Sequence, residues 1–598
     1  MDCLIYIRKK IMRITNIINK INLKKSIPVF IILIATIVAS RQLFTGGYFP
    51  IHDDMQVARL YQMDLCFRDG QIPCRWVPDM GYGYGYPLFN YYPPLPFYFG
   101  ELVHTIGFSI IDSTKVMFIA GFLMSAVLMY LFSRKLWGDW GGLLSSVLYL
   151  FAPYHSVDVY VRGAMNEHWA LAFLPGVCWA VYEIIDGNDK KYISVMSLFF
   201  SFLLLSHNLM ALIFTPVIGV FALLLIWLKK KKFYAKIWPL LIGGVWGVGL
   251  AAFFTLPVLL EKKFVHVETM LMGYFNYLAH YVSIGKLFFT RFWGYGSSSW
   301  LQTEGMPFQI GFPQWPLAVI AFILFIVLYF RRKISKEKAV IASFFFFLFL
   351  FSSFLIHSRS VFIWDRISFF AYLQFPWRFL TLVIFSVSVL GGGVIILLKD
   401  GKKQIAAAFL LIILTVVLNF SFFKPQKIIE ITDSEKLFSA KGWNRLQTDA
   451  IFDYLPIYAK APPGGPAPEL PEIKLGFAEI FEVVKTSNRY GFKVRAEIES
   501  IIRVPVYDFP GWKAKVDNYK AEITHDNDLG LITLTVPEGE HFVNLEFTNS
   551  PIRLLGNFIS LTSFGLLVTL FVKRVSQIFI FKKAKKPEIK KNTSKKKK

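Results

Sequence analysis

The sequence predicts a polytopic α-helical membrane protein with about twelve spans and a β-rich domain inserted before the last span. Of its 598 residues, 55% are hydrophobic, and apolar runs long enough to cross a bilayer recur along most of the chain. Lys and Arg gather in short clusters between these runs. Near the C-terminus, apolar and polar side chains alternate with a period of two, which is typical of strands rather than helices.

Twelve apolar runs define the predicted spans, at residues 27–45, 115–133, 140–154, 167–185, 192–206, 209–228, 236–257, 313–330, 339–356, 377–397, 403–420 and 553–573. A further segment, 94–111, contains prolines together with Glu101 and His104 and could form a span or an interfacial helix. The N-terminal stretch has the basic flank and short apolar core of a signal peptide. Because that flank is long, we expect an uncleaved anchor.

The charged residues decide the predicted orientation. Lys and Arg exceed Asp and Glu by 25, and the surplus lies in clusters such as 229–232, 331–338 and 399–403 and in the C-terminal tail. The positive-inside rule then predicts a cell-membrane protein with both termini, 1–26 and 574–598, in the cytoplasm. It also assigns 94–111 to an external loop. No nucleic-acid-binding motif accompanies the basic excess, so no nucleic-acid partner is expected.

The main membrane domain is predicted at 27–420, with three longer regions outside the membrane at 46–114, 258–312 and 421–552. The third differs from the others. The turn-rich "PPGGPAPELP" at 462–471 is followed by the alternating segments "LITLTV" (531–536) and "FVNLEF" (542–547). Such alternation, broken by Pro, Gly and Asn, predicts antiparallel strands with one buried face. We expect a small extracytoplasmic β-sandwich of about a hundred residues.

Polar side chains collect at the predicted outer face. They are His52, Asp53 and Asp54 after the first span, His155, Asp158, Arg162 and Glu167 after the third, His207 after the fifth, Arg291 in the loop 258–312, and Gln374 and Arg378 before the tenth. The fifth to twelfth spans carry no ionisable residue near their middles, whereas an ion-coupled transporter usually does. The pattern favours a reaction at a lipid head group.

The four cysteines show no CxxC spacing of the kind that binds metal. Cys66 and Cys74 lie in one predicted external loop, where they could form a disulfide or remain free thiols.

Several segments resemble bacterial multi-pass proteins labelled 6-pyruvoyl-tetrahydropterin synthase-related. They are "DVYVRGAMNEHWA", "LLSHN", "FWGYGSS", "QFPWRFL", "DYLP" (453–456) and "FPGW" (509–512). Nothing resembles a soluble pterin enzyme with a zinc-binding His cluster. The order of one span, an external loop opening with an acidic pair, "YYPPL" (91–95) and many further spans also resembles the GT-C superfamily of integral-membrane glycosyltransferases.

In GT-C enzymes a carboxylate in the first external loop binds a metal or acts as the base, and the donor is usually a sugar on a polyprenyl phosphate. The resemblance therefore implies Asp53 as base, Asp54 as its alternate or as a partner in binding Mg²⁺ or Mn²⁺, and Glu167 as a further catalytic carboxylate. Arg162 and Arg378 would stabilise the departing lipid phosphate. His52, His155, Asp158, His207, Arg291 and Gln374 complete the predicted substrate-binding set.

Structural roles compete with these assignments. Either aspartate could cap a helix beginning in "HDDMQVARL", and Arg162 with Glu167 could be an ion pair that only holds a loop. Two other functions are also open: a flippase or exporter of lipid-linked saccharides, and a non-catalytic envelope assembly protein. The leading hypothesis is a glycosyltransferase whose donor is a polyprenyl-phosphate-linked sugar carried in the membrane lipid. Its acceptor would be a glycan or a protein, and the sequence leaves its identity open.

Overall fold

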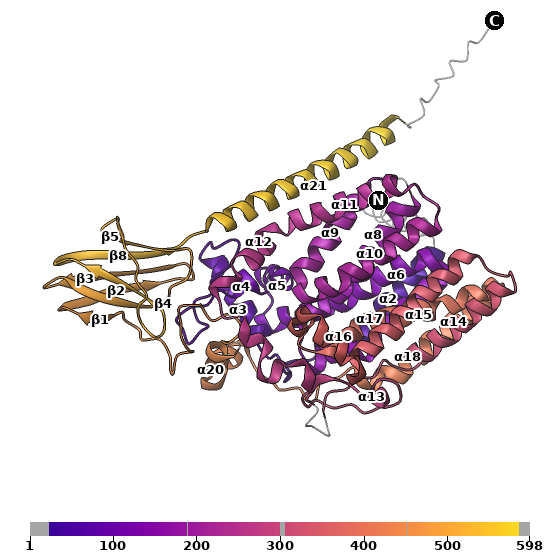
Figure 1. Ribbon diagram of the computed structural model, residues 1–598, viewed down its shortest axis with the longest axis horizontal. Coiled ribbons are helices and arrows are strands. Elements are labelled where there is room, and N and C mark those ends of the chain that lie inside the picture. The colour runs from indigo at the N-terminus through magenta and orange to yellow at the C-terminus, as the bar shows by residue number, and fades with distance from the viewer. Residues whose placement is uncertain (1–22, 188, 300–304, 450, 585–598) are drawn as a thin grey trace, which may run out of the picture.

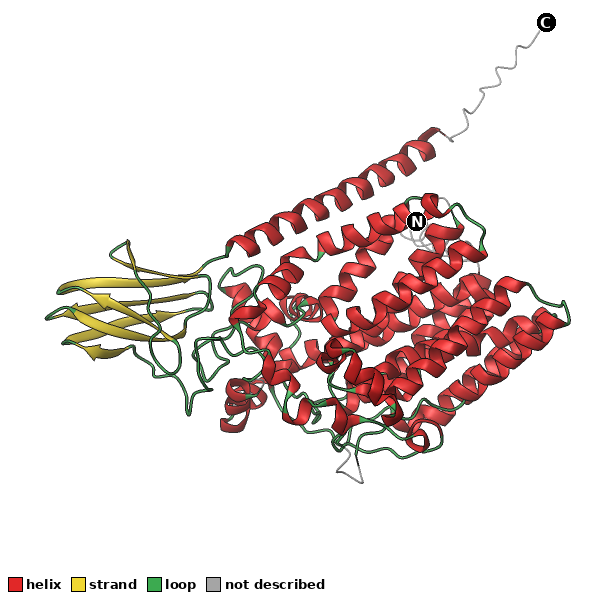
Figure 2. Ribbon diagram, viewed as in Figure 1, coloured by secondary structure: helices red, strands yellow, loops and turns green. Residues whose placement is uncertain are grey.

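The computed structural model describes residues 23–584 except 188, 300–304 and 450. A body of packed helices occupies most of the molecule, and two sheets extend from one end of it (Figures 1 and 2). The basic N-terminal stretch through residue 22, with its signal-like flank, and the lysine tail from 585 lie outside the described residues.

The described residues form eight helices long and apolar enough to cross a membrane, with three shorter apolar helices among them. Every predicted apolar run falls mainly in a helix of this body. The helices are α2 (Leu23–Ala39), α6 (Ile110–Leu150), α8 (Met165–Asp186), α9 (Lys191–Ser206), α10 (Asn208–Leu228), α11 (Phe233–Leu250) with α12 (Ala252–Leu260), α14 (Gln314–Phe330), α15 (Lys336–Ile356), α17 (Leu380–Gly392), α18 (Gly401–Asn419) and α21 (Pro551–Ala584).

Helix α6 is two antiparallel helices joined at Gly138. This residue has φ +75° and ψ 177°, a conformation outside the helical region that glycine adopts without strain. Ser146 Oγ donates a hydrogen bond to the carbonyl oxygen of Ala126 at 2.7 Å. Twenty residues of straight helix would separate these groups by about 30 Å, so the chain must reverse between them. The two predicted runs at 115–133 and 140–154 are therefore the two arms of one hairpin.

The loop between α2 and α6 is folded. It contains α3 (Gln56–Arg68), α4 (Leu88–Tyr91) and α5 (Leu95–Thr105). Helix α5, in the segment whose role the sequence left open, has 11 residues, fewer than the roughly 20 that a span needs. Cys66 and Cys74 form a disulfide that joins the end of α3 to the following turn.

The eight strands of the described residues form two antiparallel sheets with a shared apolar core. One sheet has the order β1-β4-β7 and the other β2-β3-β8-β5-β6. The predicted strand 531–536 is β7, and 542–547 lies within β8. The strands are β1 (Glu472–Leu475), β2 (Ala478–Lys485), β3 (Arg489–Ala496), β4 (Ser500–Tyr507), β5 (Trp512–Val516), β6 (Tyr519–Ala521), β7 (Leu531–Val536) and β8 (Gly539–Phe547).

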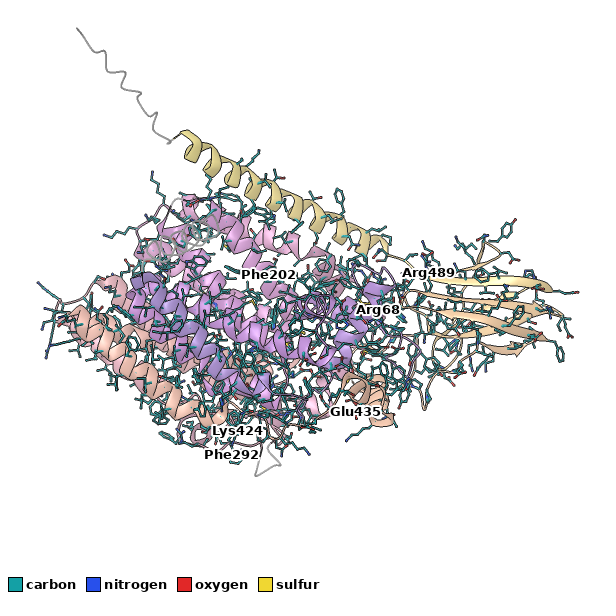
Figure 3. All side chains as sticks on the ribbon, turned by 180° about the vertical axis from the view of Figure 1, so that it is seen from behind. Arg68, Phe202, Phe292, Lys424, Glu435 and Arg489 are labelled. Atoms are coloured by element: carbon teal, nitrogen blue, oxygen red, sulfur yellow. A yellow bond between two sulfur atoms is a disulfide. The ribbon has the colours of Figure 1, made fainter. Side chains whose placement is uncertain are left out.

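The sheets are fastened to the helical body. Trp76 of the first loop packs edge-on against Trp512 of β5, with ring centroids 5.6 Å apart. Glu261, just after α12, forms a fully buried ion pair with Arg553 of α21 at 2.8 Å. Figure 3 labels Arg68 of α3 and Arg489 of β3 on either side of this junction. These contacts tie the sheets to the end of the body that carries the first loop.

Two short helices, α19 (Asp433–Phe438) and α20 (Ala440–Thr448), also pack on this end, where Figure 3 labels Glu435. Leu437 and Leu446 belong to the same apolar core as the long helices. The Asp433 carboxylate accepts hydrogen bonds from the first two backbone amides of α6, at 2.7 and 2.9 Å. Residues 433–448 therefore belong to the helical body rather than to the sheets.

Candidate functional site

The chain between α6 and α8 forms a sharp, irregular connection. It runs through α7 (Pro153–Ser156) and the π-helical turn η2 (Val157–Val161) before turning at Arg162 and Gly163. Single π-helical turns occur frequently at functional sites. Gly163 has φ +68°, and a Cβ there would lie 2.3 Å from Ile51 Cδ1, so the turn requires glycine. The turn holds the Arg162 side chain beside the first turn of α8.

Arg162 is the centre of a buried hydrogen-bond network. Its guanidinium donates to Asp158 Oδ1 at 2.5 Å, to Glu167 Oε2 at 2.9 Å and to the Tyr154 hydroxyl at 3.1 Å. Tyr154 in turn donates to Glu167 Oε1 at 2.5 Å. Asp158 and Glu167 are both at most 1% exposed. We call Tyr154, Asp158, Arg162, Glu167 and Arg378 the arginine cluster.

Arg378 reaches this network from η9 (Pro376–Phe379), at the start of the predicted tenth span. Its Nε lies 3.8 Å from Glu167 Oε2, and its Nη1 donates to Leu373 O and to Gln374 Oε1. The Arg162 guanidinium lies 4.4 Å from the centroid of the Trp377 ring. Arg378 Nε and Trp377 Nε1 are buried and find no hydrogen-bond acceptor among the described residues.

The arginine cluster brings two guanidiniums and two carboxyl groups together out of water. Burial, and then the charge of Glu167, raises the pKa of Asp158 well above its usual value, although Arg162 beside it acts in the opposite direction. Burial lowers the pKa of Arg162, but Glu167, Tyr154 and Asp158 together more than offset this, so the pKa is raised overall. Buried guanidinium donors are suited to a phosphate group.

A second group of polar side chains adjoins the first. The Asp53 carboxylate pairs with Arg59 of α3 at 2.8 Å and accepts a hydrogen bond from Gln56 at 2.9 Å. Arg59 also donates to the Tyr92 hydroxyl at 3.0 Å. The backbone amide of Asp53 donates to the carbonyl oxygen of Arg162 at 2.8 Å. The Asp53 side chain is 38% exposed, whereas the arginine beside it is almost completely buried.

Asp453 completes this second group, and it was absent from the residues predicted from the sequence. It lies close enough to Arg59 and Asp53 for their charges to act on its pKa. Burial raises that pKa to about 6, with Arg59 lowering it and Asp53 raising it. The next residue, Tyr454, stacks on Tyr91 of the first loop. We call Asp53, Gln56, Arg59, Tyr92 and Asp453 the aspartate cluster.

Asp54 faces different partners from Asp53. Its carboxylate is 6% exposed and accepts hydrogen bonds from Lys436 of α19 and Arg445 of α20, both at 2.6–2.7 Å. Its two oxygens are therefore occupied by cations. Among the described residues, no group of three His, Cys, Asp or Glu side chains gathers in a way that could hold a metal ion. The pairing of Asp53 with Asp54 does not fit the predicted Mg²⁺ or Mn²⁺ ion.

Of the remaining predicted site residues, His207 lies beside the arginine cluster and the others lie elsewhere. The His207 ring accepts from two backbone amides at the start of α10, and burial lowers the pKa of His207 to about 3, with Arg378 the next cause. His52 Nε2 lies 2.9 Å from the carbonyl oxygen of Tyr295 and is exposed. His155 is enclosed in the core, with its ring 4.7 Å from that of Tyr149.

Arg291 lies outside both clusters. Its Nη2 donates to the carbonyl oxygen of Leu418 at the end of α18, and its guanidinium lies 5.2 Å from the ring centroid of Phe422. The structure thus brings together Asp53, Asp158, Arg162, Glu167, His207, Gln374 and Arg378 and leaves Asp54, His52, His155 and Arg291 with other partners. Asp453 could have been found from the "DYLP" motif.

Residues 89–425 match the profile of a family described as "6-pyruvoyl-tetrahydropterin synthase related domain; membrane protein". This confirms the resemblance predicted from the sequence. An uncharacterized protein of Lactococcus lactis subsp. cremoris (strain MG1363) is 24% identical over 322 residues. The match covers 52% of this chain and 50% of the relative, so the chain spans about half the length of the curated protein that it matches.

Similar solved structures include the oligosaccharyltransferase of Archaeoglobus fulgidus in its apo form, at 14% identity and a TM-score of 0.37. That match covers 75% of this chain and 62% of the other. ArnT from Cupriavidus metallidurans, solved with undecaprenyl phosphate bound, matches at 11% identity and a TM-score of 0.36, covering 65% of this chain and 63% of the other.

Proposed function

The chain belongs to the 6-pyruvoyl-tetrahydropterin synthase related family of membrane proteins, and we propose that this member is an integral-membrane glycosyltransferase. In this proposal it moves a sugar from a polyprenyl-phosphate donor to an acceptor hydroxyl at the extracytoplasmic face. One observation carries the proposal. Two buried arginines, one of which has an Nε without a hydrogen-bond acceptor among the described residues, lie next to the carboxylates of the aspartate cluster, and a backbone hydrogen bond from Asp53 to Arg162 joins the two clusters.

The proposed orientation has twelve spans, with both termini in the cytoplasm and the two clusters outside. The distribution of charge along the body supports it. Lys229 pairs with Asp186 and Glu337 at the end of the body opposite the sheets, and Arg574 pairs with Asp189 there. Basic loops at one end and a polar site at the other are expected when the first end faces the cytoplasm.

The disulfide supports the same orientation. Cys66 and Cys74 lie in the first loop, at the end of the body that carries the sheets and the two clusters. Disulfides persist in oxidising, extracytoplasmic compartments and are rare in the cytosol. The predicted domain arrangement, with 421–552 outside and 553–573 as the last span, follows from this assignment.

The proposed reaction breaks the bond between the anomeric carbon and the lipid phosphate oxygen and forms a new bond from that carbon to the acceptor oxygen. The acceptor hydroxyl gives its proton to a carboxylate of the aspartate cluster. The electron pair of the broken bond leaves with the phosphate, whose charge grows as the bond lengthens. Arg378 and Arg162 stabilise that charge in a site shielded from water.

Each residue then has a separate task. Glu167 and Asp158 hold Arg162 in place, and Tyr154 fixes the orientation of Glu167. Arg378 is the principal phosphate contact, because its Nε has no hydrogen-bond acceptor among the described residues. Asp53 remains a candidate base, and Asp453 is its closest alternative.

The test uses the purified full-length chain with undecaprenyl phosphate as the probe. Arg378→Gln removes a charged hydrogen bond worth about 1.5–3 kcal/mol, so we expect binding to weaken at least about tenfold. Arg291→Gln is the matched control, because that arginine contacts only the end of α18 and a phenyl ring in the described residues. Equal binding by the wild type and Arg378→Gln would overturn the assignment.

Catalysis is tested separately in liposomes that contain undecaprenyl-phosphate hexoses. The release of free undecaprenyl phosphate reports sugar transfer. The double variant with Asp53→Asn and Asp453→Asn should retain binding of undecaprenyl phosphate but lose its release from the donor. Undiminished release would refute a glycosyltransferase that uses these carboxylates and would leave a carrier of lipid-linked saccharides as the better interpretation.

A further inference from the structure

A hollow of about 580 Å³ lies at the end of the helical body opposite the sheets. It is formed where α10 ends, α11 begins and α15 begins. Its apolar wall comes from Leu223, Ile226, Trp227 and Phe233, and its basic rim from Lys230, Lys231 and Lys336. This volume is in the range of about 300–1,000 Å³ that is typical of ligand-binding pockets.

The neighbouring lysine has a different role. Lys229 is neutralised by Asp186 of α8 at 2.9 Å and by Glu337 of α15 at 2.8 Å. These ion pairs hold the ends of three helices together next to the hollow. Lys229 is therefore a structural residue. Because it pairs with both nearby carboxylates, neither is available to the lysines of the basic rim.

The three lysines of the rim keep their charge available. Among the described residues, no carboxylate lies within ion-pair distance of Lys230, Lys231 or Lys336. The Lys336 ammonium lies 4.8 Å from the centroid of the Trp227 ring, which orients it across the hollow. Three unpaired cations around one concavity repel one another and favour an anionic ligand.

The backbone supports this arrangement. Lys230 has φ +50°, the left-handed conformation that helices commonly use at their C-terminal end and that glycine usually occupies. Its amide donates to the carbonyl oxygen of Trp227, and the amide of Lys231 donates to that of Ile226. The turn thus places two consecutive lysines at the rim, at the cost of backbone strain in Lys230.

We propose that this hollow binds the phosphate head group of an anionic phospholipid. A soluble anion would need only the lysines. Trp227 is 57% exposed, Leu223 50% and Phe233 47%, so a large apolar surface borders the same site. Tryptophan at the level of the head groups and basic residues at the cytoplasmic face are what a lipid with an anionic head group contacts. The phosphate would lie among the lysines and the glycerol backbone and acyl chains against the apolar wall.

The experiment measures lipid retention by the purified full-length chain, with phosphatidylglycerol compared with phosphatidylcholine by native mass spectrometry. The variant Lys230→Gln, Lys231→Gln and Lys336→Gln should lose at least about tenfold in phosphatidylglycerol retention, the factor expected from loss of a charged hydrogen bond. The control variant Lys399→Gln, Lys402→Gln and Lys403→Gln removes the same charge from another basic cluster, at the start of α18, and should retain the lipid.

Three outcomes would overturn the proposal. Equal losses in both triple variants would indicate diffuse attraction of anionic lipid to basic loops. No loss in either variant would show that the hollow does not bind the head group. Full displacement of the lipid by inorganic phosphate, with retention unchanged by Trp227→Ala, would assign the site to a soluble anion. Because the substituted side chains are all exposed, the thermal unfolding temperature of each variant should match that of the wild type.

Discussion

Replacing Asp453 by Asn is expected to stabilise the protein at neutral pH and to impair sugar transfer at the same time. The reason is that burial raises the pKa of Asp453 from its usual 3.8 to about 6, so at pH 7 the folded protein holds a charged carboxylate where a neutral group would be more stable. Asparagine has the same shape and carries no charge. The variant therefore removes the free-energy cost of the buried charge, and it also removes the proposed proton acceptor.

The size of the effect follows from the shift in pKa. About two pKa units correspond to about 3 kcal/mol, and solvent that reaches this partly buried side chain reduces the gain to about 1–3 kcal/mol. The pKa is raised on folding, so the stabilisation by the neutral carboxyl is fully present below pH 3.8 and is lost as the pH rises through about 6. The variant should therefore differ from the wild type at pH 7 and agree with it near pH 4.

The assay combines thermal unfolding with the pH profile of undecaprenyl phosphate release. In the wild type, transfer should rise as the pH increases through about 6, because the deprotonated carboxylate is the form that accepts the proton. Asp453→Asn should lose that rise. Asp449→Asn is a matched control, because Asp449 lies in the same segment and forms a part-exposed ion pair with Arg445 at 3.1 Å.

Two results would refute the reasoning. If Asp453→Asn lowered the unfolding temperature at pH 7 more than Asp449→Asn does, the carboxylate would be stabilising rather than costly. If the inflection near pH 6 persisted in the variant, another group would be responsible for it. A gain of stability with unchanged transfer would leave the burial argument intact and remove Asp453 from the chemistry.

Three further changes probe the structure around the site. Arg162→Gln should lower the free energy of unfolding by about 3–5 kcal/mol, because it leaves Glu167 buried without its main cation, and denaturation curves of the purified chain would contradict this if they were unchanged. Gly163→Ala should abolish transfer and reduce the yield of folded protein. The new Cβ would lie 2.3 Å from Ile51 Cδ1, and the φ of +68° at this position disfavours alanine. Normal activity would show that the turn can relax. Both cysteines are buried, so in denatured protein Cys66 and Cys74 should react with maleimide only after a reductant is added, and labelling without reductant would mean that they are not bonded.

The helical body could be predicted from the sequence because its signals are local. Length and apolar composition identify a membrane helix without reference to the rest of the chain, and strands such as 531–536 show in their alternation. The pairing of Arg162 with Glu167 was also accessible, since the two residues are five apart at a helix start. In each case the residues that interact are close in sequence.

The partners of Asp54 could not be predicted in the same way. Lys436 and Arg445 are 382 and 391 residues away and lie on short helices in a region expected to belong to a separate β-rich domain. The contact of these two residues with Asp54 depends on the path that the chain takes after its eleventh predicted span, which the local sequence does not reveal. The same is true of Asp453, which joins Asp53 only because residues 433–459 fold back onto the first loop.

The separation of the two clusters bears on whether the protein is an enzyme or a carrier. A carrier of lipid-linked saccharides needs a site for the phosphate, which the arginine cluster alone would supply. Such a carrier has no evident use for a further carboxylate beside Asp53, because burial raises the pKa of Asp453 and its charge at neutral pH then costs stability. The proposed proton acceptor, in contrast, has to be close to its pKa at the working pH, and a raised pKa of about 6 suits that role.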